Sequence, residues 1–259
     1  MQIDRVHHER VGSTNDIAKT LASEGLRRPL LISAEEQTRG RGRMGRAWSS
    51  PQGGAWMTLV WPGVPDDDRD VLPTAPLVVG LAVADTIDAL LRNANDRHDS
   101  RHVQIKWPND VLLGGKKVAG VLCEREIGPT GGSPLIVGVG VNVANDTSSL
   151  GSADGPPRFP PISISEFAGV VVRPAEIVDA FVDRVVPLLE RLVRSGFTPE
   201  LRRAIEDRMA YLQDGMVRIG RSEPAEVLGV DDAGRLRVRF ADQSEATYAS
   251  GEVRIESGR

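Results

Sequence analysis

The chain has a single cysteine, Cys123, among its 259 residues. An internal disulfide is therefore excluded, and none of the four histidines stands at metal-ligand spacing from this cysteine. Cys123 is most simply a buried strand residue.

A long apolar segment is also missing. Residues 1–24 contain no apolar run, and the apolar helix pattern of residues 77–91 is interrupted by Asp85 and Asp88. We therefore expect neither a signal peptide nor a membrane span, and a cytoplasmic location. The composition, 40% hydrophobic and 26% charged, is that of a globular protein, and a net charge of -4 gives no overall attraction to nucleic acid or acidic membranes.

Lysine is rare in this arginine-rich chain. Only four of the 32 basic residues are lysines, and three of them lie between Lys106 and Lys117. This placement indicates a need for compact ammonium groups there. Upstream, RGRGRMGR at residues 39–46 interleaves four arginines with three glycines, which is typical of a flexible anion-binding loop. Together the two segments predict a site for a phosphorylated substrate.

Hydrophobic periodicity predicts an α+β fold, a mixed sheet flanked by helices. Strands are expected at residues 3–11, 30–35, 54–61, 103–107, 116–124 and 135–143, and helices after the capping residues 12–15 and at about 74–91, 174–195 and 199–212. The Ser-, Gly-, Asp- and Pro-rich stretch 145–161 is predicted to be a mobile loop that serves as a lid.

The last part of the chain has a different pattern. From Gly215 onward, short β runs alternate with turn signals, which predicts a small separate barrel. We expect a main domain of residues 1–212 and a small domain of residues 213–259.

The glycines of the basic loop match a dinucleotide-binding pattern, G-x-G-x-x-G, at residues 40–45. That pattern must open a helix, whereas Trp48 and Pro51 follow here, so a Rossmann site is not indicated. A solvated basic turn or a nucleic-acid patch is the alternative interpretation of this loop.

In the lysine segment, Lys106 precedes a turn at residues 107–110, and Lys116 and Lys117 follow Gly114–Gly115. This arrangement predicts a hairpin that presents ammonium groups at its ends. The alternative is that the two adjacent lysines merely blunt an exposed strand edge.

Four motifs, in this order, resemble those of the biotin protein ligases, also called biotin–[acetyl-CoA-carboxylase] ligases. They are GSTN at 12–15, EEQTRGRGRMGRAW at 35–48, KWPNDVLLGGKKVAGVLCE at 106–124 and GVGVNV at 138–143. GEVRI at 251–255 is similar to the closing strand of the family's small Src-homology-3-like β-barrel, so the resemblance covers nearly the whole chain. It implies a class II synthetase-like catalytic domain of the biotin–lipoate ligase type, followed by that barrel.

The resemblance also implies a two-step reaction. Biotin and ATP would form biotinyl-5′-AMP and pyrophosphate with the help of Mg²⁺, and a lysine of a biotin carboxyl carrier protein domain would then take up the biotin. Fixed positive charge is needed because a carboxylate and a triphosphate repel each other.

Site residues follow from the matching positions. The implied catalytic residues are Arg41, Arg43 and Lys117. The implied biotin-binding residues are Ser13, Thr14, Asn15, Gln37, Gly40, Arg41, Gly42, Arg43, Lys117 and Gly120, and the nucleotide would meet Arg43, Trp48, Asn109, Asp110, Lys117 and Asn142, with Mg²⁺ near Asp110. Structural alternatives exist for Ser13 as a helix cap, Trp48 as a core residue and Gly120 as a packing point.

Other functions and partners stay open at this point. Bifunctional relatives carry a DNA-reading domain ahead of the first strand, whereas eleven residues precede Gly12 here, so we expect a ligase without a nucleic-acid partner. Lipoate ligases and octanoyltransferases share the fold, and a non-enzymatic phosphate- or nucleic-acid-binding module is a further alternative. An exposed sheet edge could pair with the carrier domain or with a second copy in a homodimer.

Overall fold

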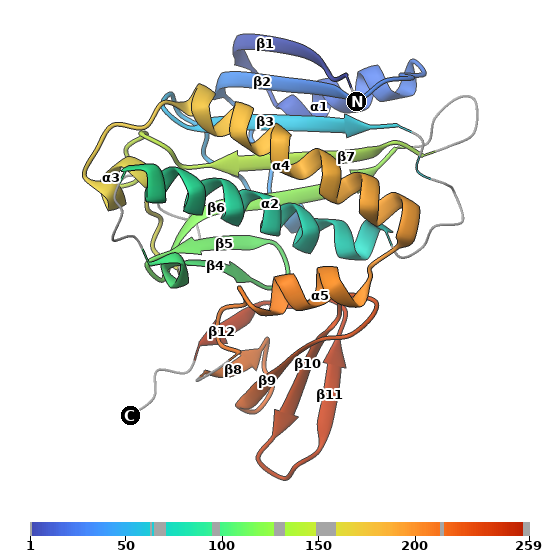
Figure 1. The fold of residues 1–259 in the computed structure, drawn as a ribbon, viewed down its shortest axis with the longest axis vertical. Helices are drawn as coiled ribbons and strands as arrows, with labels where there is room; N and C mark the ends of the chain where they lie inside the picture. Colours follow the sequence, from blue (N-terminus) through green and yellow to red (C-terminus); the bar gives the residue numbers. More distant parts are fainter. Residues whose placement is uncertain are drawn as a thin grey trace.

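The computed structural model of the chain describes residues 2–62, 64, 71–94, 99–126, 133–148, 159–212 and 215–255. Two sheets organise these residues: a seven-stranded sheet flanked by helices, and a five-stranded antiparallel sheet at its lower end (Figure 1). The predicted α+β fold with a small C-terminal β unit is confirmed.

The larger sheet consists of β1 (Asp4–Val11), β2 (Leu30–Gln37), β3 (Ala55–Trp61), β4 (Val103–Lys106), β5 (Asp110–Leu113), β6 (Lys116–Arg125) and β7 (Leu135–Val141). The helices are α1 (Thr14–Ser23), α2 (Val71–Ala94), α3 (Ile164–Ala168), α4 (Pro174–Ser195) and α5 (Pro199–Glu206). The smaller sheet consists of β8 (Met216–Ile219), β9 (Ala225–Val230), β10 (Leu236–Phe240), β11 (Glu245–Tyr248) and β12 (Val253–Ile255).

The larger sheet is covered on both faces. Its strand order is β1-β2-β3-β7-β6-β5-β4, with β1 parallel to β2 and the other pairs antiparallel. Leu31 and Leu59 belong to the core under α2 and α4, whereas Ile32 and Val60 pack with Ala18 of α1 in a second cluster. Successive side chains of a strand point to opposite faces, and both faces are covered here, so all seven residues of β3 are buried and Thr58 is the one polar residue among them.

Helix α2 is the most apolar helix of the fold. Among the described residues it alone has the length and hydropathy to cross a membrane, and 78% of its most apolar stretch is buried inside the fold. It packs against α4 and against β6, in front of the sheet in Figure 1, as a core helix does.

The lysine segment differs from its prediction. Residues 110–113 form a strand of their own, β5, so Lys106 and Lys117 belong to two successive hairpins rather than one. Gly114 and Gly115 have φ of 57° and 77°, the left-handed pair that a two-residue hairpin needs, and this turn is what makes so short a strand possible. The edge-blunting alternative for β6 is wrong, because β6 lies between β5 and β7.

Two helices also differ from the predictions. The helix expected at 199–212 ends at Glu206, because the following residues dock on β4: Met209 makes a parallel bridge to Ile105. The short helix α3 was not predicted, since five residues give too little periodicity to detect. Most of the predicted lid loop, 149–158, lies outside the described residues.

Polar contacts connect the smaller sheet, and the segment that precedes it, to the rest of the fold. Trp107 Nε1 donates to the carbonyl oxygen of Gly234 at 3.0 Å, and Arg208 Nη2 contacts Asp85 at 2.9 Å and Asp88 at 3.0 Å on α2. Residues 213 and 214 lie outside the described part, so the domain boundary between 212 and 213 stays a prediction.

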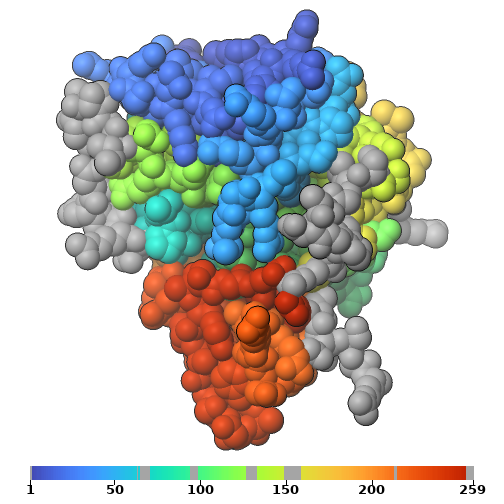
Figure 2. All heavy atoms as spheres, turned by 180° about the vertical axis from the view of Figure 1, so that it is seen from behind, coloured from blue at the N-terminus to red at the C-terminus, as the bar shows by residue number. Residues whose placement is uncertain are grey.

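On the opposite face, the light-blue segment between β2 and β3 descends toward the red residues of the smaller sheet (Figure 2), where Arg46 Nη2 lies 3.7 Å from Glu252 Oε2. The loop with the arginines and the C-terminal sheet therefore meet on one side of the molecule.

The Arg208 ion pairs predict a clear stability effect. Arg208→Ala should lower the free energy of unfolding by about 3 kcal/mol, because it leaves the nearly buried Asp88 carboxylate with less compensation. The control is Arg202→Ala, whose ion pair with Asp232 is exposed and should contribute less than about 1 kcal/mol. Urea denaturation measures both values, and equal losses would contradict this assignment.

Candidate functional site

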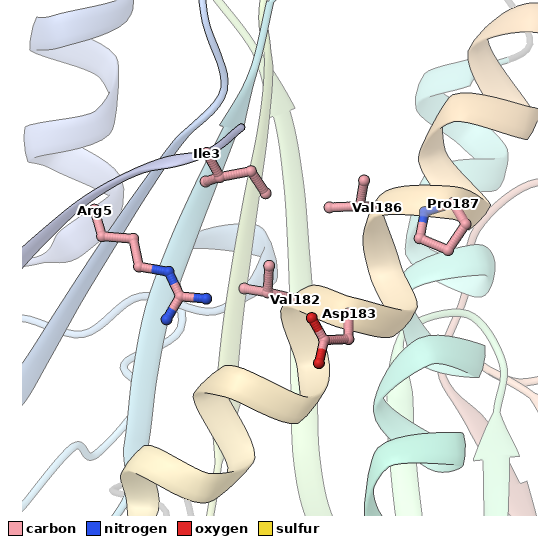
Figure 3. Close-up of a pocket in the computed structure, with 6 residues that line it drawn as sticks. All are labelled: Ile3, Arg5, Val182, Asp183, Val186 and Pro187. Atoms are coloured by element: carbon pink, nitrogen blue, oxygen red, sulfur yellow. The ribbon is translucent and has the colours of Figure 1, made fainter. Parts of the chain in front are cut away.

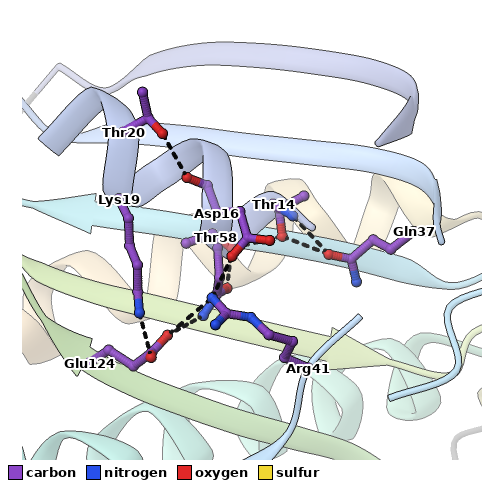
Figure 4. Close-up of polar contacts among 9 residues, drawn as sticks. Thr14, Asp16, Lys19, Thr20, Gln37, Arg41, Thr58 and Glu124 are labelled. Carbon is purple, nitrogen blue, oxygen red and sulfur yellow. Dashed lines mark hydrogen bonds and ion pairs between the residues drawn. The ribbon is translucent and has the colours of Figure 1, made fainter. Parts of the chain in front are cut away.

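Thr14 and Gln37 form a fixed polar pair where α1 begins (Figure 4). The backbone N–H and the hydroxyl of Thr14 donate to Gln37 Oε1 at 2.9 and 3.0 Å, and Gln37 Nε2 donates to Ser50 Oγ at 2.8 Å. These bonds orient the amide of Gln37. Ser13 is the N-cap of α1 and is buried, but its side chain makes no capping hydrogen bond, so the helix-cap interpretation of this hydroxyl is wrong.

The centre of β3 contributes a buried hydroxyl to the same group. Thr58, fully buried, donates to Asn15 Oδ1 at 2.6 Å, and its hydroxyl lies 2.7 Å from that of Thr14. Asn15 in turn donates to Glu124 Oε2 at 3.1 Å. Sequence reasoning missed Thr58, although a single hydroxyl within the apolar run AWMTLVW was a usable signal.

Two carboxylates hold two cations beside this group (Figure 4). Lys19 Nζ lies 2.6 Å from Glu124 Oε1, while Arg41 Nη2 lies 2.6 Å from Asp16 Oδ1 and 3.8 Å from Glu124 Oε2. Partial burial acts to raise the pKa of Glu124, but hydrogen bonds from Lys19 and Asn15 and the nearby charges lower it by more. Glu124 is therefore ionised, and it ties α1 to β6 and to the arginine loop.

The arginine–glycine loop is a narrow hairpin. Arg41 bridges Ala47 in antiparallel fashion, and Gly42 N donates to the carbonyl oxygen of Arg46 at 2.8 Å. Met44, at the tip, has left-handed backbone angles and is 88% exposed. Ordering of this loop on ligand binding stays a prediction.

The indole of Trp48 lies over two glycines of the sheet. Gly120 and Gly140 are cross-strand partners on β6 and β7, and a Cβ at Gly140 would come within 2.5 Å of Trp48 Nε1. A Cβ at Gly120 would come within 3.0 Å of the same ring, and one at Gly40 within 2.3 Å of the Trp48 carbonyl oxygen. Nε1 of Trp48 is buried without a hydrogen-bond partner among the described residues, so it is a donor that a ligand could satisfy.

Asp110 binds two lysines at once. Its Oδ1 lies 2.7 Å from Lys117 Nζ and its Oδ2 lies 3.2 Å from Lys106 Nζ, and both Asp110 and Lys106 are buried. Burial alone would raise the pKa of Asp110, but the two ammonium groups together lower it by more, so the carboxylate is ionised. The Lys117 ammonium also lies 5.0 Å from the centroid of the Trp48 ring.

The backbone of Lys117 is anchored as well. Its N–H donates to the Pro160 carbonyl oxygen at 2.9 Å, and its own carbonyl oxygen accepts from Ile162 at 3.0 Å. The neighbouring Lys116 is exposed and lies 4.0 Å from Glu166 on the surface. The two adjacent lysines thus have different environments, and only Lys117 joins the Asp110 cluster.

Arg43 connects the loop to the lysine segment. Its Nη1 donates to Asn109 Oδ1 at 3.3 Å, and Asn109 Nδ2 donates to the Val121 carbonyl oxygen at 2.8 Å. Burial lowers the pKa of Arg43, with Asp110 acting in the opposite direction. Asn142 lies in a separate buried pair, where its Oδ1 accepts from Asn145 at 3.1 Å.

The predicted site residues therefore fall into one region, with Asn142 bound at its margin. Two segments more than sixty residues apart, the arginine loop and the lysine segment, converge there. The described residues contain no group of three His, Cys, Asp or Glu side chains that could cage a metal. Sequence reasoning missed Asp16, Lys19, Thr58 and Glu124, although Lys19 is the only lysine outside residues 106–117. The ammonium group of Lys106 was predicted, but its pairing with Asp110 was not.

A hollow between β1 and α4 lies elsewhere on the molecule (Figure 3). Ile3 and Arg5 line one side, and Val182, Asp183, Val186 and Pro187 line the other. Arg5 also forms an ion pair with Asp179 of α4. This hollow contains none of the predicted site residues.

Comparison with known proteins agrees with this geometry. The model of the biotin/lipoate A/B protein ligase family matches residues 8–142. The biotin–[acetyl-CoA-carboxylase] ligase of Paracoccus denitrificans is 35% identical over 89% of this chain and 92% of its own length. The bifunctional ligase/repressor BirA of Bacillus spizizenii is 31% identical over 95% of this chain and 72% of its own length.

Solved structures show the same fold. The biotin protein ligase from Aquifex aeolicus in complex with biotin and ATP superposes with a TM-score of 0.76 at 25% identity, covering 98% of this chain and 99% of that one. The Leishmania major enzyme in complex with biotinyl-5-AMP gives a TM-score of 0.64 at 25% identity, with 98% and 99% coverage. The chain belongs to the biotin/lipoate A/B protein ligase family.

The Asp110 cluster predicts a pH-dependent stability. Asp110→Asn should lower the free energy of unfolding near neutral pH by about 3 kcal/mol, because two ammonium groups lose their shared counter-charge. The folded-state pKa of Asp110 is lowered, so its contribution is present above the unfolded pKa of about 4 and is lost as the pH falls through the folded value. The difference in the free energy of unfolding between wild type and Asp110→Asn should therefore become smaller as the pH falls from 6 to 3. Urea denaturation across this range measures it, and a constant gap would refute the role of this carboxylate.

Proposed function

We propose that this chain is a biotin protein ligase. It converts biotin and ATP to biotinyl-5′-AMP and pyrophosphate, and it transfers the biotinyl group to a specific lysine of a biotin carboxyl carrier protein domain. Family membership, the relative named as a biotin–[acetyl-CoA-carboxylase] ligase and the Aquifex aeolicus complex with biotin and ATP support the proposal. The observation that carries it here is the convergence of the arginine loop and the lysine segment at Arg43, Asn109 and Asp110.

The polar group where α1 begins suits the biotin head group. A buried ureido ring needs hydrogen-bond partners, and Thr14, Asn15 and Gln37 present hydroxyl and amide groups that are already oriented. Ser13 adds a buried hydroxyl beside them. The backbone at Gly40, Gly42 and Gly120 is proposed to border the pocket. Trp48 packs against Gly40 and Gly120, so a ligand can reach the backbone there only if this residue moves.

Adenylate formation places a carboxylate against a triphosphate, so their repulsion must be offset. We assign this task to Arg41, Arg43 and Lys117. Asp110 holds Lys117 in place, so the positive charge needs little reorganisation during the reaction. Arg41 is paired with Asp16, and we propose that the biotin carboxylate competes with Asp16 for this guanidinium group.

The nucleotide is proposed to lie across Trp48, Asn109 and Asp110. Trp48 offers an aromatic face and an unpaired indole N–H, both of which suit an adenylate. Asn142 is bound to Asn145, so its amide must change partner to reach the nucleotide.

Mg²⁺ is proposed to enter with ATP. The ion usually keeps several waters and binds one or two carboxylates together with substrate phosphates. Asp110 is the carboxylate that we propose lies beside the triphosphate. Both of its oxygens contact lysines, so these residues fit an ion carried by the triphosphate better than an ion bound permanently by the protein. Its chemistry there is to neutralise phosphate charge.

The mixed anhydride must be shielded from water until an acceptor lysine arrives. We propose that the arginine loop covers it and that the segment joined to Lys117 through Pro160 and Ile162 helps to close the site. A cytoplasmic location, the absence of operator DNA binding and a homodimer formed through a sheet edge stay predictions.

The two adjacent lysines provide a matched test. Lys117→Met should lower the rate of biotin-dependent pyrophosphate release by about 10²- to 10³-fold, because it removes a preorganised cation. Lys116→Met removes the same charge from an exposed position and should leave the rate within about twofold of wild type. A similar loss in both variants would argue against a specific role for Lys117.

The substrate itself is tested with the wild-type chain. Incubation with ATP, Mg²⁺, biotin and a biotin carboxyl carrier domain should add one biotinyl group to the carrier, as measured by mass spectrometry. Lipoate and octanoate should support neither pyrophosphate release nor a mass gain. Modification by either of these acids in place of biotin would overturn the proposed substrate.

A further inference from the structure

Tyr211 has a strained backbone. It lies in the segment that leads from α5 toward the smaller sheet and has φ of 76°, a left-handed conformation that costs a bulky residue roughly 1–3 kcal/mol. The segment is fixed to β4, because Ile105 N donates to the Arg208 carbonyl oxygen at 2.7 Å and Ala210 N donates to that of Ile105 at 2.8 Å. The strain is therefore held in place by the surrounding fold.

The hydroxyl of Tyr211 is also unsatisfied. It is buried and has no hydrogen-bond partner among the described residues. Such an orphaned group costs roughly 1–3 kcal/mol, and a phenylalanine would fill the same space without this cost. Packing alone therefore does not explain a tyrosine at this position.

The segment that leads into Tyr211 is bonded to Ile105, the residue before Lys106 of the cluster formed by Asp110, Lys106 and Lys117. Burial and, after it, the negative charge of Asp110 raise the pKa of Tyr211, so the phenol stays protonated. Asp110 itself is occupied by Lys106 and Lys117. The hydroxyl is thus a protonated donor without an acceptor among the described residues.

We infer that Tyr211 is a nucleotide-binding residue whose hydroxyl donates a hydrogen bond to a phosphate oxygen of bound ATP. This inference rests on the proposed function. The phosphate chain is favoured over the biotin head group because the polar group around Gln37 lies on β2, whereas Tyr211 follows a segment docked on β4, at the opposite edge of the sheet. Binding would satisfy the orphaned hydroxyl and so offset part of the strain.

The test is Tyr211→Phe, which removes only the oxygen. The chain has one other tyrosine, Tyr248 on β11, so Tyr248→Phe is the matched control. Tyr211→Phe should weaken ATP binding by about tenfold, the effect of one lost hydrogen bond to a charged group, and raise the KM for ATP while the KM for biotin stays unchanged. Without ATP its free energy of unfolding should equal or exceed that of wild type, because an orphaned hydroxyl has been removed.

A second measurement does not depend on activity. With ¹³Cζ-labelled tyrosine the NMR spectrum contains two tyrosine signals. The signal that is missing in Tyr211→Phe should shift when a non-hydrolysable ATP analogue and Mg²⁺ are added, and biotin alone should not move it.

Three outcomes would overturn the inference. Unchanged ATP binding in Tyr211→Phe would show that the ring only fills space. If Tyr211→Phe impairs only the transfer onto the carrier lysine, or if the Tyr211 NMR signal responds to biotin alone, the hydroxyl binds a ligand other than the ATP phosphates. If the wild-type chain does not bind ATP at all, the proposed function itself is refuted. This outcome is measured on the wild-type chain and does not need the variant.

Discussion

A buried carboxylate shared by two lysines is the interaction on which this site depends. Asp110 is nearly inaccessible, and it stays ionised because Lys117 and Lys106 contact one oxygen each. A buried charge is costly unless it is paired, so this cluster fixes the ends of β4, β5 and β6 relative to one another. The same pairing positions the Lys117 side chain. Arg43, which donates to the adjacent Asn109, attaches the arginine loop to this fixed point.

The sheet makes this convergence possible. Its central strands are buried on both faces, and at Gly120 and Gly140 two neighbouring strands lack side chains, which opens space directly above the backbone. The Trp48 indole fills this space. On the same sheet the hydroxyl of Thr58 reaches Asn15, while Glu124 links Asn15, Lys19 and Arg41. Positioning of the polar groups is therefore a property of the core and not of the loops alone.

The sequence predicts the fold class and most of the strands, because these depend on local pattern. It also predicts that Arg41, Arg43 and Lys117 belong to the site, because motif order identifies them. Strand β5 could not be predicted, because four residues between two turns show too little hydrophobic periodicity. The end of α5 was also missed, because tertiary docking on Ile105, not local propensity, stops the helix. Lys19 and Glu124 meet across more than a hundred residues, and Tyr211 is identified only by its φ and its unpaired hydroxyl, which are properties of the folded chain.

The central claim is that Asp110 presents Lys117 to the reacting carboxylate and phosphate. The most direct measurement is a crystal structure of the chain with a non-hydrolysable biotinyl-adenylate analogue. The account predicts the Lys117 ammonium within about 3 Å of the linkage between biotin and phosphate, with Asp110 still in contact with Lys106. An analogue bound away from Lys117, with Lys117 still paired only with Asp110, would contradict it.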